Sequence, residues 1–464
     1  MIESPIDPVS RLLAVARPHL APAFCHVGWF AFFLILAPVV GPRGYGLFMF
    51  ALGAIALVEA LLVETAAAAL DGAAVLDELH WSTALVTTMA AGTAVSLALF
   101  ASAATIGARV GEAGFGDLFR SLAPLPLLGG LMVVPSAMLR RKGRAAVLSA
   151  ASAAGVAAGG GIAVALAWAG AGAWSLVAQV VVGRLVECTA LWATPGQRIG
   201  LAWSPRHFAE LASRVDGRMA TNFWPALATY APCLVVGAML GPIATGLYML
   251  AERLGHVLSD VFLADPTKFP RKAVERVCRV LLPMVLASAL LPIALPPIVD
   301  LLWWGAVLPA QILILNTLPA AIAFVGAAGA GREASRWRWD AARAVGGLVV
   351  TALAAPLGLV AIATAAVGWA SVVAVASTWP LWRKRAVAWR ATFIVAVRPC
   401  IGAGAAGFLV ALLADPVGLA LPAIPALCLL TATGWSLYLL VRGDPIGVAV
   451  PPTHTPLIAP VAEA

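Results

Sequence analysis

Charged residues are scarce in this sequence. Asp, Glu, Lys and Arg make up 11% of the 464 residues, whereas hydrophobic residues make up 62% and the mean hydropathy is +0.95. A water-soluble protein carries about 25% charged residues. So few charges cannot cover a water-facing surface of this size. The composition therefore excludes a soluble globular protein and predicts a chain that is solvated mainly by lipid.

Other absences narrow the function. The six cysteines lie in or beside apolar segments without CxxC spacing, so we interpret them as packing residues and not as metal or redox ligands. No GxxxxGK[ST] loop is present, which argues against nucleotide-driven transport. The longest outer connection, around 106–117, holds only Arg109, Glu112 and Asp117, too few carboxylates for a membrane glycosyltransferase or polymerase. We expect no enzyme activity, cofactor or metal.

Long apolar runs fill most of the chain. A helix needs about 20 apolar residues to cross the hydrocarbon core, and the chain has room for about 12 to 14 such spans. The first run is longer than a signal-peptide core, so we expect it to remain as an uncleaved span. We also expect Trp303 and Trp304 to anchor the outer membrane surface. The predicted spans are 22–40, 46–69, 83–105, 118–139, 145–169, 174–193, 221–240, 246–264, 280–299, 305–328, 344–363, 365–382, 396–414 and 418–441.

The basic residues are distributed unevenly between the two sides of the membrane. If the N-terminus is cytoplasmic, most of the 30 Lys and Arg residues fall on cytoplasmic connections, such as RRKGR at 140–144 and TKFPRKAVERVCR at 267–279. The outer connections hold only Arg43, Arg109 and Arg120. This bias fits the positive-inside rule with both termini in the cytoplasm. The net charge of +8 is dispersed over many short loops, so it indicates membrane topology and not nucleic-acid binding.

One short motif occurs twice. GPRGYGLFMFA begins at Gly41 and GPIATGLYMLA begins at Gly241, and each copy follows one apolar span and leads into another. Glycine and proline suit a very short connection between antiparallel helices. An even number of predicted spans separates the copies, and an even number preserves orientation. We therefore predict two parallel six-helix repeats related by an axis along the membrane normal, followed by an extra helix pair.

Several segments resemble one family of membrane transporters. LAPVVGPRGYGLFMFAL is similar to the first helix hairpin of oligosaccharide flippases in the multidrug/oligosaccharidyl-lipid/polysaccharide (MOP) superfamily, and VVGAMLGPIATGLYMLAERL is similar to their seventh-to-eighth hairpin. PSAMLRRKGRAAVLSAASAAG resembles their fourth-to-fifth connection, and AWAGAGAWSLVAQVVVGRLVE resembles their sixth helix. The resemblance extends over residues 30–375 and includes no catalytic signature.

The resemblance implies an all-α polytopic membrane protein with a MATE-like, V-shaped bundle. It implies a flippase that moves an undecaprenyl-pyrophosphate-linked oligosaccharide across the bacterial inner membrane by alternating access, for O-antigen (lipopolysaccharide) or exopolysaccharide biosynthesis. The implied partners are this cargo, membrane lipid, and the polysaccharide polymerase and glycosyltransferases of the same pathway. The expected parts are a cytoplasmic segment 1–21, a six-helix bundle 22–193, a cytoplasmic linker 194–220, a six-helix bundle 221–382, a helix pair 383–441 and a cytoplasmic tail 442–464.

Ionisable residues inside the spans are the candidates for substrate binding. A charge at the centre of a membrane helix costs about 2.5–3.5 kcal/mol, so it should face protein or water. The substrate-binding candidates are Glu59, Arg184, Glu252 and Arg253. Arginine suits a pyrophosphate because its planar guanidinium presents several donors at once. The alternative for Arg184 is neutralisation by Glu187, three residues further along the same helix.

Three ionisable residues in the eighth span are candidates for proton coupling. Glu252, His256 and Asp260 are spaced by four, so they share one face of a helix. We predict that one of them carries a coupling proton. The alternative is that Asp260 lies in headgroup water and Glu252 only balances a neighbouring charge.

A MATE-type, cation-coupled drug exporter is the nearest alternative function. Cationic drugs favour acidic cavities, whereas a pyrophosphate favours basic ones. The candidates mix both signs, with Glu252 beside Arg253 and Glu187 near Arg184, so charge alone leaves both functions open. The hairpin motifs favour the polysaccharide branch, and a non-transporting scaffold in glycan assembly is a third alternative.

Overall fold

The computed structural model describes part of the chain, and every regular element in that part is a helix. The described residues are 8–73, 75–194, 199–213, 216–262, 301–316, 319 and 336–383. The predictions that lie wholly or mostly outside them concern the ninth span 280–299, the C-terminal half of the tenth span, the helix pair 383–441 and the tail 442–464.

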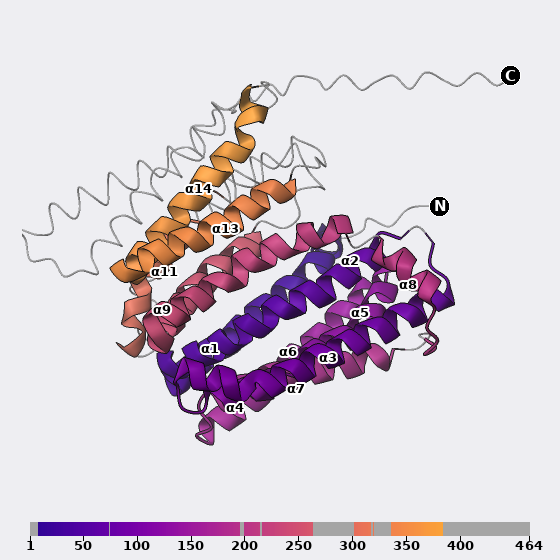
Figure 1. The fold of residues 1–464 in the computed structure, drawn as a ribbon, viewed down its shortest axis with the longest axis horizontal. Coiled ribbons are helices and arrows are strands. Elements are labelled where there is room, and N and C mark those ends of the chain that lie inside the picture. Colours follow the sequence, from indigo (N-terminus) through magenta and orange to yellow (C-terminus); the bar gives the residue numbers. More distant parts are fainter. Residues whose placement is uncertain are drawn as a thin grey trace, which may run out of the picture.

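Eight helices in the described residues are long and apolar enough to cross a membrane. In Figure 1 the helices of the first half, drawn from indigo to magenta, lie together, and α9 runs beside α1 toward the orange helices. The first half contains α1 (Pro8–Glu59), the π-helical turn η1 (Ala60–Glu64), α2 (Thr65–Asp71), α3 (Glu78–Val110), α4 (Phe115–Leu122), α5 (Leu125–Arg141), α6 (Ala145–Trp168) and α7 (Trp174–Trp192). The chain continues through α8 (Pro205–Ala212), α9 (Asp216–Phe262), η4 (Leu301–Ala306), α11 (Val307–Ile314), α13 (Arg336–Ala354), η5 (Ala355–Leu357) and α14 (Leu359–Arg383).

Helices α1 and α9 are hairpins, each folded at one glycine. Gly41 has φ 69° and Gly241 has φ 81°, values in a region that glycine adopts readily and other residues avoid. The rings of Phe33 and Tyr45 lie 4.2 Å apart, although twelve residues of straight helix would separate them by about 18 Å. The chain therefore reverses at Gly41, and the predicted Gly-Pro turns between antiparallel helices are confirmed.

The two hairpins contact each other reciprocally, backbone against backbone. A Cβ atom added to Gly46 would lie 1.8 Å from the carbonyl oxygen of Pro242, and one added to Gly246 would lie 2.0 Å from that of Pro42. No side chain fits at either glycine. We call this contact, formed by Pro42, Gly46, Pro242 and Gly246, the hairpin seam. It places both copies of the motif at the same end of the molecule, as the parallel repeat requires.

Equivalent positions of the two copies are buried equally. The pairs Phe48 and Tyr248, Met49 and Met249, and Ala51 and Ala251 are all buried. The side chains differ within only one of these pairs, where a phenyl ring replaces a phenol ring. The sequence match therefore corresponds to a match in packing, because each arm that follows a turn buries the same face.

The prediction of a surface anchor at Trp303 and Trp304 is wrong for the first of them. Trp303 is fully buried, and its indole Nε1 donates a hydrogen bond to the Ala37 carbonyl oxygen at 3.1 Å. Its ring packs edge-on against Phe33 and Tyr45. Trp303 thus fastens the second half to the first hairpin, while the adjacent Trp304 is exposed.

One predicted boundary also needs correction. The eleventh and twelfth spans, predicted at 344–363 and 365–382, correspond to α13 and α14, which separate earlier in the chain. Pro356 lies between them and Gly358 has φ 96°, so the apolar run cannot continue as one helix there. Within the expected linker 194–220 the structure describes one short helix, α8.

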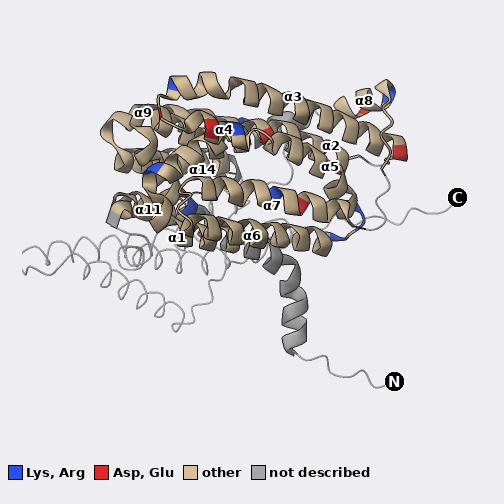
Figure 2. Cartoon of the chain, turned by 90° about the horizontal axis from the view of Figure 1, so that it is seen from below, with Lys and Arg blue, Asp and Glu red and all other residues tan. Residues whose placement is uncertain are grey.

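Charged residues gather near the two ends of the long helices, and few lie between (Figure 2). Helix α7 is an exception, because it carries Arg184 and Glu187 partway along its length. A sparse interior charge fits helices that cross a hydrocarbon layer. The few interior charges are therefore the residues to examine for function.

We predict that Gly46→Ala will lower the unfolding temperature of the detergent-solubilised chain. Its methyl group has no space against Pro242, and overpacking costs about 1–3 kcal/mol. Gly161→Ala in α6 is the matched control, because a Cβ at Gly161 would have no atom within 4 Å. Alanine is favoured over glycine in a helix by about 0.5–1 kcal/mol, so the control should unfold at the same or a higher temperature. Equal effects of the two substitutions would contradict the close contact at the seam.

Candidate functional site

An ion pair joins two helices of the first half. The Arg184 guanidinium of α7 lies 3.2 Å from Oε1 of Glu59, the last residue of α1. The Glu59 side chain is 12% exposed and the Arg184 side chain 40% exposed. The pairing neutralises both charges within helices that are otherwise apolar. The structure therefore brings together two of the four predicted substrate-binding residues.

A glycine on a third helix makes room for the Glu59 carboxylate. A Cβ added to Gly129 of α5 would lie 2.7 Å from Glu59 Oε1. The carboxylate therefore packs directly against the α5 backbone. This contact places the ion pair where α1, α5 and α7 meet, inside the first group of helices.

Glu187 binds a different helix from Arg184. It accepts a hydrogen bond from the Ser152 hydroxyl of α6. Helices α6 and α7 approach closely, because a Cβ added to Gly155 would lie 2.6 Å from the Gly183 carbonyl oxygen. Such small-residue contacts are typical of membrane helices. Arg184 and Glu187 thus contact α1 and α6 respectively, and the predicted alternative of self-pairing on one helix is not what the structure contains.

Arg253 lies between the two hairpins. Its guanidinium carbon is 5.2 Å from the centre of the Trp29 ring, a cation–π distance, and Trp29 belongs to the first arm of α1. The preceding residue, Glu252, is partly buried on the same helix. These two predicted residues therefore lie on the second arm of α9, and Arg253 contacts the first arm of α1. The side chains of His256 and Asp260 lie outside the described part, so their proton-coupling role stays a prediction.

Two neutral polar residues inside the helices were missed by the sequence analysis. The Tyr45 hydroxyl is buried without a hydrogen-bond partner among the described residues, and it lies within electrostatic range of Arg253 and Glu252. Both amide atoms of Gln179 on α7 are likewise buried and unpaired in this part of the chain, and the residue is 3% exposed. Unpaired buried polar groups are rare in proteins. The sequence signal for Tyr45 and Gln179 is a polar residue among apolar neighbours, and the predicted site contains only charged residues.

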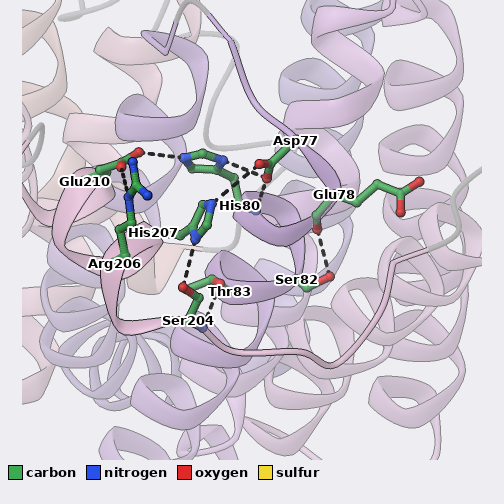
Figure 3. Close-up of polar contacts among 9 residues, drawn as sticks. All are labelled: Asp77, Glu78, His80, Ser82, Thr83, Ser204, Arg206, His207 and Glu210. Carbon is green, nitrogen blue, oxygen red and sulfur yellow. Dashed lines mark hydrogen bonds and ion pairs between the residues drawn. The ribbon is translucent and has the colours of Figure 1, made fainter.

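A histidine cluster was also missed. Asp77 and His80 at the start of α3 meet His207 and Glu210 of α8 (Figure 3). The His80 backbone N–H and imidazole hold the pKa of the Asp77 carboxyl at about 2. The two histidines are far apart in the sequence, and no spacing rule connects them. The cluster forms only because α8 docks onto α3, which the sequence does not predict.

The fold resembles two kinds of solved transporter. One is the lipid II flippase MurJ in an inward closed conformation, with a TM-score of 0.68 and 11% identity over 91% of this chain and 98% of that one. The other is a multidrug resistance MATE family transporter of the MOP superfamily, with a TM-score of 0.53 and 13% identity over 78% and 94% of the respective chains. The protein is thus a multi-pass membrane protein with a MOP-type fold.

The sequence defines the family more narrowly. Residues 35–265, from the first hairpin to the end of the second, match the family model described as polysaccharide biosynthesis protein. No curated protein sequence matches the chain. The chain belongs to the polysaccharide biosynthesis protein family, as its hairpin motifs predict.

We predict that Glu59→Gln and Arg184→Gln will each lower the unfolding temperature, and that the double variant will lose less than the sum of the two. Each single change leaves a charge without its partner. For a fully buried pair this costs about 3–5 kcal/mol, and the partial exposure of Arg184 reduces the cost here. A double-mutant cycle measured by thermal unfolding isolates the coupling.

The pair between Arg43 and Glu112 supplies the control cycle. It also joins two helical regions, at 2.6 Å, but its arginine is 63% exposed. Solvent screens an ion pair with an exposed arginine, so its coupling should be small. If the coupling energy between residues 59 and 184 is no larger than that of the control pair, their ion pair does not stabilise the fold.

Proposed function

We propose that this protein is a flippase for a lipid-linked oligosaccharide carried on undecaprenyl pyrophosphate. The observation that carries the proposal is the match of residues 35–265 to the polysaccharide biosynthesis family in a chain with a MOP-type fold. Such a chain needs a cargo that belongs to polysaccharide synthesis and must cross a membrane. A lipid-linked oligosaccharide meets both requirements.

The arginines supply the chemistry that a pyrophosphate needs. A dianionic group that crosses a low-dielectric layer must exchange its water for fixed donors. Arg184 has five N–H donors, and Glu59 contacts it through one nitrogen. Arg253 lies between α1 and α9, where a relative movement of the two hairpins would change its surroundings. We assign both residues to binding of the cargo's pyrophosphate.

The acidic residues give a way to release the cargo. Glu59 and a pyrophosphate compete for the Arg184 guanidinium, so the strength of the Glu59–Arg184 pair sets the affinity for the anion. Protonation of Glu59 would free Arg184 for the cargo. Glu252, next to Arg253, is the corresponding candidate in the second half, and His256 and Asp260 remain candidates on the same helix. In this scheme a proton is the coupling ion.

The charge distribution supports an orientation of the chain in the membrane. Arg140, Arg141, Lys142 and Arg144 lie at the end of the helices opposite Arg43. By the positive-inside rule, the end with more basic residues faces the cytoplasm. We infer that both termini are cytoplasmic and that the cargo moves outward across a bacterial inner membrane. The enzymes that assemble and polymerise the glycan are the expected pathway partners.

A cation-coupled drug exporter is the second candidate. The fold similarity to the MATE family transporter favours it, as do the acidic side chains of Glu59 and Glu252. The family match favours the polysaccharide cargo, because the matched family is described as polysaccharide biosynthesis protein. We therefore rank the drug exporter second.

We predict that Arg184→Ala and Arg253→Ala will each slow translocation of a fluorescent pyrophosphate-linked oligosaccharide by about tenfold or more. A hydrogen bond to a charged group contributes about 1.5–3 kcal/mol, and 1.4 kcal/mol corresponds to tenfold. The assay uses vesicles that contain the purified full-length chain. A membrane-impermeant quencher removes the fluorescence of cargo in the outer leaflet, so the rate of fluorescence loss reports translocation. Arg253→Lys keeps the charge but loses the planar donors, and should recover part of the rate.

Arg109→Ala is the control for this assay, because Arg109 is exposed at the end of α3. It should flip cargo at the wild-type rate. Wild-type vesicles that export a cationic dye but do not flip the oligosaccharide would replace the proposed function with the second candidate. Unchanged flipping in both arginine variants would remove these residues from the cargo site.

A further inference from the structure

The histidine cluster places three metal-ligating groups around one point. Asp77 Oδ1 lies 2.8 Å from His80 Nδ1, and Asp77 Oδ2 lies 3.5 Å from His207 Nε2. One ligand atom from each of the three residues lies within 4.8 Å of the others. Ligands on a tetrahedral zinc ion are about 3.3 Å apart, so side-chain shifts of about 1 Å would bring all three into contact with one ion.

The outward nitrogens of both imidazoles also have partners. His80 Nε2 lies 3.1 Å from Glu210 Oε2, and the Arg206 side chain contacts the other oxygen of that carboxylate at 3.3 Å. His207 Nδ1 lies 2.8 Å from the Ser204 hydroxyl. A metal-bound histidine almost always donates its second ring N–H to such an acceptor, which fixes the ring orientation. The cluster contains this outer layer as well as the inner one.

We propose that Asp77, His80 and His207 form a binding site for one divalent transition-metal ion of the zinc type. Two imidazoles and a carboxylate are a donor set that Zn²⁺ favours, and Mg²⁺ or Ca²⁺ would prefer oxygen ligands alone. The histidine side chains are 13% and 17% exposed, whereas the Asp77 side chain is 59% exposed. The ion therefore keeps a position open to water on the Asp77 side. The expectation of no metal is contrary to this proposal, because cysteine spacing gives no sign of histidines that two docked helices bring together.

The local structure holds the ligands in place without the ion. Asp77 caps α3, accepting a hydrogen bond from the His80 backbone N–H at 2.8 Å. The Ser204 backbone N–H, just before α8, donates to the Thr83 hydroxyl at 3.2 Å. These contacts dock the start of α8 against the first turns of α3. Figure 3 shows the two imidazoles next to each other between these helices, with the Glu78 side chain directed away. The rings meet edge to face, with their centres 4.3 Å apart.

The position of the site gives the ion a role. Helix α8 belongs to the segment that connects α7 of the first half to α9 of the second. An ion held by α3 and α8 fastens this connection to the first half. Loss of the ion would loosen the fastening, so zinc availability would adjust how freely the two halves move. This role is independent of the cargo and of the residues proposed to bind it.

Zinc titration of the tag-free full-length chain in lipid nanodiscs tests the site. We expect saturable binding of one Zn²⁺ per chain, measured by calorimetry and by competition with a chromophoric chelator. Asp77→Asn keeps the helix cap but removes the charged ligand, and His207→Gln removes a ligand from α8. Each should abolish this binding. Glu210→Gln should weaken it by about 10–100-fold, because it removes only the outer partner of His80.

Glu78→Gln is the matched control, because it removes a neighbouring carboxylate that points away from the cluster. It should bind zinc as the wild type does. Zinc should also raise the unfolding temperature of the wild type and of Glu78→Gln, but not of His207→Gln. Asp77→Asn and His207→Gln change different helices. If one variant misfolds, zinc binding by the other still tests the proposal. Absence of saturable binding, or wild-type binding by a folded Asp77→Asn or His207→Gln chain, would overturn the proposal.

Discussion

The contact between the two hairpins is the constraint on which the rest of the structure depends. At Gly46 and Gly246 the chain has no side chain, and the backbone of each hairpin occupies the space that a methyl group would need. In a chain solvated by lipid, apolar side chains gain little by leaving the lipid for each other. Close backbone packing is then the main source of helix association. This seam brings Trp29 near Arg253 and allows Trp303 to reach Ala37.

The second constraint is electrostatic, and it determines where the candidate site lies. An ionised group among apolar helices needs an opposite charge, a dipole or an aromatic face. Glu59 pairs with Arg184, and Glu187 accepts a hydrogen bond from Ser152. Arg253 makes a cation–π contact with Trp29. In each case the partner lies on another helix. Each contact therefore joins two helices as well as stabilising a charge. A transporter that uses these groups must exchange such partners for cargo, and this links binding to helix movement.

Much of the fold was predictable from the sequence, but the site was predictable only in part. Hydrophobic runs and Gly-Pro turns identified the helices around Gly41 and Gly241, because these signals are local. The helix boundary at Gly358 was not predicted, because the residues on both sides of it are apolar and the sequence reads as one continuous hydrophobic run. Glu59 and Arg184 were selected by their charge, but their pairing depends on packing among α1, α5 and α7. His80 and His207 were missed because only the docking of α8 brings them together.

The reciprocal geometry of the seam has a consequence for the origin of this protein. Pro42 receives Gly246 as Pro242 receives Gly46, which is the relation found in an isologous interface between two identical subunits. Before the gene was duplicated and fused, the ancestor would have made the same contact as a parallel homodimer around a two-fold axis. Fusion then allowed each copy to change alone, so that Arg253 now stands where the first copy has Gly53. The two halves thus became different within a pairing that was originally symmetric.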